Sequence, residues 1–135
     1  MSFSEGRKGK RKTVRPDMEV FDQAMALASV GSDAEFLNEV VGLVQAAWPT
    51  LLAHIREAIA KRNLPAVEMS ARLAKAAARN VSSRKAYESA LQLETMAGKG
   101  DLQGAQRASA NLEQDVEKLQ SVLSKVRNFA WFWEG

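Results

Sequence analysis

The sequence predicts an all-α fold, an antiparallel up-down four-helix bundle with a short N-terminal helix and an extended C-terminal helix. Apolar residues recur at spacings of three and four along most of the chain, which places them on one face of a helix. No window shows the alternating Val, Ile and Thr pattern that is typical of a strand. The connections between the predicted helices are short, and short connections make neighbouring helices antiparallel.

The length and composition indicate one domain with additions at both ends. The chain has 135 residues and is 46% hydrophobic, which is enough for one core and too little for two ordinary domains. We divide it into a basic tail (1–16), a helical domain (17–127) and an aromatic extension (128–135). The absence of cysteine excludes disulfides, thiolate metal sites and a cysteine nucleophile. No secretory signal is recognisable and no window approaches the roughly 18 apolar residues of a membrane span, so we expect a soluble, cytoplasmic protein without a membrane partner.

The basic charge belongs to the tail. Residues 1–16 contain six Lys or Arg against Glu5, whereas the rest of the chain holds 13 basic and 15 acidic side chains. Such an arm could contact nucleic acid, acidic lipid or an acidic protein, since a phosphate contact needs only charge. We interpret it as a solvated arm or a linker, and expect no nucleic-acid partner.

Two helices are predicted before residue 63. Residues 18–28 support a short helix, with apolar positions either at Phe21, Met25 and Ala28 or at Ala24 and Leu27. Gly31 favours a C-cap, and Ser32 or Asp33 can cap the next helix, over about 34–62. Its predicted apolar face consists of Phe36, Val40, Leu43, Val44, Ala47, Leu51, Ile55, Ala58 and Ile59. Pro49 should kink this helix near residues 45–49 or split it.

Asn63 and Pro65 mark the start of a third helix, with Asn63 as the N-cap and the proline in the first turn, and it runs to about Asn80. Its predicted buried face is Val67, Ala71, Ala74, Ala78 and Val81. The opposite face carries Glu68, Arg72, Lys75, Ala76 and Arg79, a small patch ringed by long charged side chains. Such a face can dock a partner.

Ser82 and Ser83 cap a fourth helix over about 84–98, with an apolar face of Ala86, Tyr87, Ala90, Leu91, Leu93 and Met96. The last helix, predicted over 102–132, has a heptad seam of Leu112, Val116, Leu119, Leu123, Val126, Ala130 and Trp133. At 1.5 Å per residue it would be about 46 Å long, more than the other helices can cover.

The extension concentrates four aromatic side chains, Phe129, Trp131, Phe132 and Trp133. That is much apolar surface to leave in water. Three interpretations stay open: the rings fold back on the bundle or on the N-terminal helix, they form a homodimer or partner contact, or the helix end frays.

The usual catalytic patterns are absent. With one histidine, no Gly-rich phosphate loop and no HExxH, we expect neither an enzyme nor a metal or other cofactor. His54 lies beside Leu51, Ile55 and Ala58, where we interpret it as a residue at the edge of the apolar face. A phosphate-accepting imidazole is the alternative.

The order of these features resembles the histidine-containing phosphotransfer (HPt) domains of bacterial two-component phosphorelays, over about residues 20–124. The features that match in type and spacing are Phe21-Asp22, Gly31-Ser32-Asp33, Phe36-Leu37, Trp48-Pro49 with Leu51-Leu52, Leu93-Glu94 and Gly100-Asp101-Leu102. In the central family run, Ala-His-x-Leu-Lys-Gly-x-x-x-Asn-x-Gly-Ala, the family's Ala, Lys and Asn fall on Ala71, Lys75 and Asn80.

Several positions depart from the family run. Arg72 replaces the phosphoaccepting histidine, Ala76 replaces a glycine, and Ser82-Ser83 replaces Gly-Ala. In the family an imidazole nitrogen takes the phosphoryl group from a receiver domain, but a guanidinium stays protonated and offers no lone pair. Ala76 narrows the space for a receiver without closing it.

The resemblance therefore implies a pseudo-HPt that binds a receiver (response regulator) domain or a histidine kinase without accepting phosphate. Its expected contact residues are Glu68, Arg72, Lys75, Ala76, Arg79 and Asn80, on a face where only Glu68 opposes the cations. The alternative is a helical scaffold or dimerisation domain that kept the fold and lost signalling.

Overall fold

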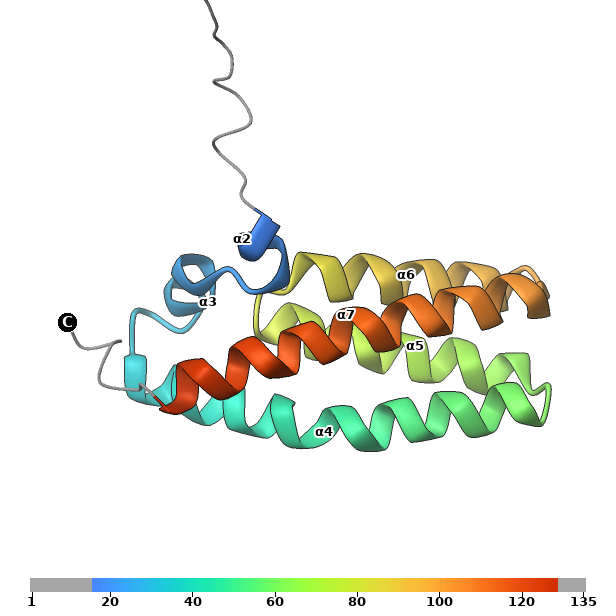
Figure 1. Ribbon diagram of the computed structural model, residues 1–135, viewed down its shortest axis with the longest axis horizontal. Helices are drawn as coiled ribbons and strands as arrows, with labels where there is room; N and C mark the ends of the chain where they lie inside the picture. The colour runs from blue at the N-terminus through green and yellow to red at the C-terminus, as the bar shows by residue number, and fades with distance from the viewer. Residues whose placement is uncertain (1–15, 129–135) are drawn as a thin grey trace, which may run out of the picture.

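The computed structural model describes residues 16–128, and all the regular structure within this range is helical, as predicted. The helices are α2 (Pro16–Val20), α3 (Gln23–Ser29), α4 (Ala34–Ala60), α5 (Leu64–Asn80), α6 (Arg84–Gly98) and α7 (Leu102–Asn128). Helices α4 to α7 lie side by side (Figure 1); each packs on the next in sequence, and α7 also packs against α4. Most of the predicted basic tail and nearly all of the aromatic extension lie outside the described residues.

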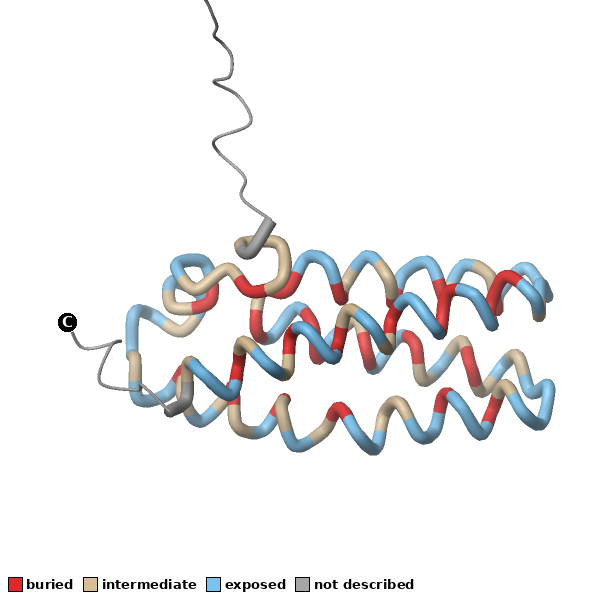
Figure 2. The backbone as a smooth tube through the Cα atoms, in the orientation of Figure 1, coloured by how far each residue is buried: buried red, intermediate tan, exposed pale blue. Residues whose placement is uncertain are grey.

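The core runs along the inner faces of the four long helices (Figure 2). Trp48 of α4 is its largest fully buried side chain. The predicted buried face of α5 is confirmed, because Val67, Ala71, Ala74, Ala78 and Val81 have no exposed surface. In the described part of the predicted α7 seam, Leu112, Val116, Leu119 and Leu123 are buried, and Val126 is half-buried against the core.

The three turns that join α4 to α7 share one backbone design. The residue before each N-cap is left-handed, with φ of 56° at Arg62, 55° at Ser82 and 76° at Gly100. The N-cap N–H then reaches back five residues, as from Asn63 to the Ala58 carbonyl at 2.9 Å. The predicted caps Asn63 and Ser83 are confirmed by their side chains, which accept N–H groups of the following helix.

The single helix predicted over 18–28 is wrong, because the chain breaks at Phe21–Asp22 into α2 and α3. The Asp22 carboxylate caps α3 by accepting the Met25 N–H at 3.0 Å, and such local bonds compete with helix continuation. The Asp22 N–H donates to the Ser82 carbonyl at 3.1 Å, which ties the break to the α5–α6 turn. Phe21 is buried, whereas Met25, which one of the two predicted apolar sets places with it, is exposed.

The predicted apolar face of α4 is confirmed at Val44 but is wrong before it. Leu37 and Val41 are buried, whereas Phe36 and Leu43 are 50% and 73% exposed. The set that begins at Phe36 and the set that begins at Leu37 both have the three-four spacing of a helix face. The fully buried Trp48 lies on the same face as Leu37. Leu91 of α6 was likewise predicted to face the core and is exposed.

Pro49 does not split α4, which is continuous from Ala34 to Ala60. A proline lacks the N–H that would bond the carbonyl four residues earlier, which here is that of Gln45. Instead, Nε2 of Gln120 in α7 donates to the Gln45 carbonyl oxygen at 2.9 Å. The Gln45 side chain in turn donates to Ser124 Oγ at 2.7 Å. We call these two bonds the glutamine clamp; it joins α4 to α7 where α4 needs an outside donor.

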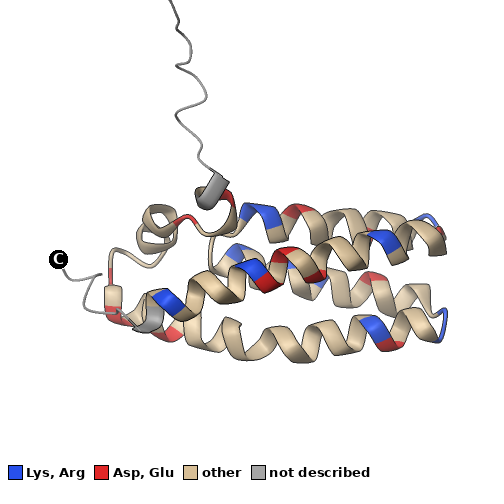
Figure 3. Cartoon of the chain, viewed as in Figure 1, with Lys and Arg blue, Asp and Glu red and all other residues tan. Residues whose placement is uncertain are grey.

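Among residues 16–128, α4 is the one helix long and apolar enough to cross a membrane. It carries no Asp, Glu, Lys or Arg between Glu39 and Arg56 (Figure 3). This corrects the expectation that no window comes near a membrane span. One such helix is weak evidence for a span, since core helices of water-soluble proteins pass the same test.

We predict that Gln120→Met lowers the free energy of unfolding by about 1 kcal/mol, because the Gln45 carbonyl loses its donor. Pro49→Ala supplies an N–H within α4. In the Pro49→Ala background, Gln120→Met should therefore lower the free energy of unfolding by close to zero. Urea unfolding of the four proteins measures this coupling. Equal losses in both backgrounds would contradict the role given to the glutamine clamp.

Candidate functional site

The predicted contact residues lie on the outer side of α5, opposite its alanine-rich buried face. Arg72, Lys75 and Arg79 follow one another at spacings of three and four, which places them on one side of α5. This side is next to α6. There they meet Tyr87 and Glu94. We call the surface formed by Glu68, Arg72, Lys75 and Arg79 of α5 with Tyr87 and Glu94 of α6 the α5–α6 face.

Glu94 is the centre of the ion pairs on this face. Its Oε2 accepts from Arg72 Nε at 2.9 Å, and Lys75 Nζ lies 2.6 Å from its Oε1. Arg72 Nη2 also reaches Glu68 Oε2 at 3.2 Å, one turn back on α5. The Lys75 and Glu94 side chains are only 20% and 16% exposed, so this pair is less screened by solvent than an ordinary surface pair.

The two cations keep Glu94 ionised. The hydrogen bond from Lys75 lowers the pKa of this carboxyl most, and the bond from Arg72 and the charges of both residues lower it further. Burial acts in the opposite direction, because it disfavours the charged form. The net effect holds the Glu94 pKa below its usual value.

The expectation that only Glu68 opposes the cations is wrong, because Glu94 pairs with both Arg72 and Lys75. Arg72 is 55% exposed, yet its guanidinium is shared between two carboxylates. Arg79 differs: within the described chain it has no carboxylate partner. Its Nη2 donates to Tyr87 Oη at 3.1 Å, and its guanidinium lies 5.2 Å from the centre of the same ring.

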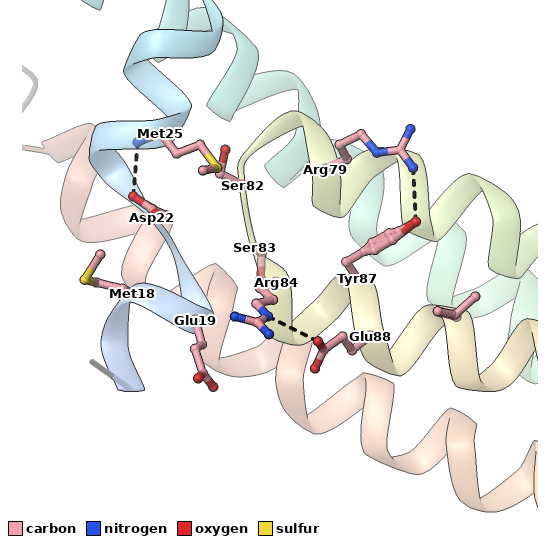
Figure 4. Close-up of a pocket in the computed structure, with 11 residues that line it drawn as sticks. Met18, Glu19, Asp22, Met25, Arg79, Ser82, Ser83, Arg84, Tyr87 and Glu88 are labelled. Carbon is pink, nitrogen blue, oxygen red and sulfur yellow. Dashed lines mark hydrogen bonds and ion pairs between the residues drawn. The ribbon is translucent and has the colours of Figure 1, made fainter. Parts of the chain in front are cut away.

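A pocket of about 540 Å³ opens beside Arg79, between the end of α5, the start of α6 and the α2–α3 segment. Met18, Met25 and Leu91 give it an apolar lining, and Arg79 and Tyr87 line it as well (Figure 4). The pocket was not foreseen from the sequence, because it depends on the break between α2 and α3.

Of the other predicted contact residues, Ala76 and Asn80 are exposed on the outer side of α5. The sequence interpretation missed two apolar neighbours, Met69 and Leu73, which are 61% and 54% exposed. Their spacing of four, off the buried face, was the available signal. It also missed the role of Glu94, for which the Leu-Glu pair shared with the HPt pattern was the signal.

His54 is exposed on α4, and no hydrogen bond or ion pair of the described residues involves it. Its neighbours Ile55 and Ala58 are buried, as expected for a residue at the edge of the apolar face. Residues 16–128 contain no cluster of His, Asp and Glu that could hold a metal ion. Comparison with protein-family models, curated proteins and solved structures gives no significant match to this chain.

We predict that Glu94→Gln lowers the free energy of unfolding at pH 7 by about 1 kcal/mol, between the values of exposed and buried ion pairs. A folded pKa below the usual 4.5 means that the ionised carboxylate stabilises the fold above pH 4.5. That contribution is lost as the pH falls through the lower, folded pKa. Urea unfolding of both proteins against pH should show two stability curves that converge in acid; parallel curves would refute the ionic role.

Proposed function

We propose that this chain is a pseudo-HPt module of a two-component phosphorelay, which binds receiver or histidine kinase domains without accepting phosphate. One observation carries the proposal. At the position where the resemblance places the phosphoaccepting histidine, α5 presents Arg72, and Glu68 and Glu94 hold its guanidinium. A protonated guanidinium has no free lone pair with which to attack a phosphoryl group.

The rest of the α5–α6 face offers no replacement for the imidazole. The chain's single histidine, His54, belongs to α4. Lys75 is paired with Glu94. Arg79, like Arg72, is a protonated guanidinium without a free lone pair. Phosphate therefore has no acceptor here of the kind that the HPt family uses.

Binding is supported by the mixture of exposed groups on α5. Met69 and Leu73 offer apolar contact area, and Arg79 offers a guanidinium without a carboxylate partner in the described chain. Apolar side chains next to arginine are typical of protein interfaces. A receiver domain presents an acidic phosphorylation pocket, whose carboxylates a guanidinium can hold by two parallel hydrogen bonds.

The proposal also interprets the architecture and the location. On it, α4 to α7 form the antiparallel up-down bundle of an HPt domain, α2 and α3 take the place of the short N-terminal helix, and α7 is the extended last helix. Receivers and kinase domains of this class act in the cytoplasm, where we place the protein. A scaffold or dimerisation domain is the second candidate, favoured by the internal ion pairing of Arg72.

We predict that the wild-type chain gains no acid-labile phosphate when incubated with a kinase and phosphorylated receivers of the same genome. Arg72→His returns an imidazole to the family position, so this variant should gain label if the α5–α6 face docks a receiver. Gel autoradiography before and after acid treatment measures both. Label on the wild-type chain contradicts the proposal, and label on neither chain favours the scaffold.

We further predict that Arg79→Glu weakens receiver binding by at least about tenfold, since an interfacial cation is replaced by a repelling charge. Arg107→Glu, on α7, makes the same charge change away from the α5–α6 face and should leave the affinity near that of wild type. Isothermal titration calorimetry gives the dissociation constants, and circular dichroism checks the fold. Equal affinities for all three proteins would exclude Arg79 from the interface.

A further inference from the structure

The pocket beside Arg79 has the size and the lining of a small-molecule site, and we call it the Arg79 pocket. Its volume of about 540 Å³ lies within the range of about 300–1,000 Å³ that is usual for ligand pockets. Two of its apolar lining residues, Met25 and Leu91, are 62% and 43% exposed to water. A ligand with an apolar body therefore gains by covering both side chains.

The wall formed by the α2–α3 segment is anchored to the rest of the fold. The Asp22 N–H donates to the Ser82 carbonyl at 3.1 Å, and both residues line the Arg79 pocket. The neighbouring Phe21 side chain is buried in the core. These two contacts hold α2 and α3 in place beside α6, so the pocket is formed before any ligand enters it.

A cation without a carboxylate partner borders this pocket. Of its two arginines, Arg84 pairs through Nε with Glu88 Oε2 at 3.2 Å. Within residues 16–128, Arg79 pairs with no carboxylate, and its Nη2 donates to Tyr87 Oη at 3.1 Å. That bond orients the guanidinium and leaves its other N–H groups to hold a carboxylate by two parallel hydrogen bonds.

The acidic side chains of the pocket determine where an anion can sit. Glu88 is neutralised by Arg84, and the Asp22 carboxylate caps α3. Glu19 lies on the far side of the pocket from Arg79 (Figure 4). An anionic group is therefore repelled at the Glu19 side and attracted at the Arg79 side.

The apolar lining favours an aromatic body. Met18 and Met25 both line the pocket, and methionine sulfur makes favourable contacts with aromatic rings. Methionine side chains also adapt to the shape of a ligand. The Tyr87 ring adds an aromatic surface to the same lining.

We propose that the Arg79 pocket binds a small aromatic carboxylic acid, whose carboxylate pairs with Arg79 and whose ring lies against Met25 and Leu91. The proposal goes beyond the signalling function and does not depend on it, since the site can be occupied without a receiver or a kinase.

The test titrates the full 15N-labelled chain with three ligands that share one aromatic body: naphthylacetate, the uncharged naphthylacetamide and the cation naphthylethylamine. Chemical-shift changes give each dissociation constant and locate the site. We expect naphthylacetate to bind with a dissociation constant below about 1 mM and to shift the signals of the pocket lining. The amide should bind at least about tenfold more weakly, and the cation more weakly still.

Two pairs of variants separate the charge from the lining. Arg79→Gln should reduce the affinity for naphthylacetate to that for the amide and leave the affinity for the amide unchanged, whereas Arg107→Gln on α7 should change neither. Met25→Ser should weaken both ligands at least about threefold. Met69→Ser is its matched control, because Met69 is 61% exposed, like Met25, but does not line the pocket.

The proposal is overturned if naphthylacetate causes no shifts at a concentration of about 5 mM, or if its shifts centre outside the Arg79 pocket. Equal affinities of the wild-type chain for the acid and the amide overturn it as well, as do equal effects of Met25→Ser and Met69→Ser. None of these outcomes bears on receiver binding, which is measured separately, so a failure here is distinguishable from a failure of the proposed function.

Discussion

The candidate site depends on the close approach of α5 and α6. The buried residues that these helices contribute are mostly alanine, namely Ala71, Ala74, Ala77, Ala78, Ala86, Ala90 and Ala97. Small side chains let two helix axes approach to about 8 Å, the lower end of the usual range. Across this alanine-lined contact, the Glu94 side chain reaches from α6 to both Arg72 and Lys75 of α5. The packing of small residues inside the fold thus determines which charges meet on its surface.

The α4 side of the core has the opposite character. It contributes large side chains, including Trp48, Leu37 and Ile55, and its polar contacts with α7 are specific. The glutamine clamp explains how a long helix keeps a proline: α7 supplies the hydrogen bond that α4 cannot make for itself. Large residues on one side and alanines on the other fill one core without requiring four equal helices.

The sequence predicted best what local chemistry determines. Asn63 and Ser83 were identifiable as caps because a cap acts within three residues of its own position. The first half of α4 was mispredicted because two overlapping sets of apolar residues both fit a helix, and only tertiary burial chooses between them. The Glu94 pairs were missed for a related reason: they depend on the rotation and stagger of α6 against α5, which three-four spacing within one helix does not define.

The ion pairs of the α5–α6 face determine whether Arg72 or Arg79 is more available to a partner. Arg72 shares two carboxylates, so a partner that takes its guanidinium must replace bonds already made. In the described chain the Arg79 guanidinium is held by the Tyr87 hydroxyl and ring, and engaging it leaves no carboxylate unpaired. On the proposed function, the centre of binding therefore shifts from the middle of α5 toward its end, where Arg79 borders the apolar pocket. Arg72 then acts mainly by filling the family's histidine position with a group that cannot react.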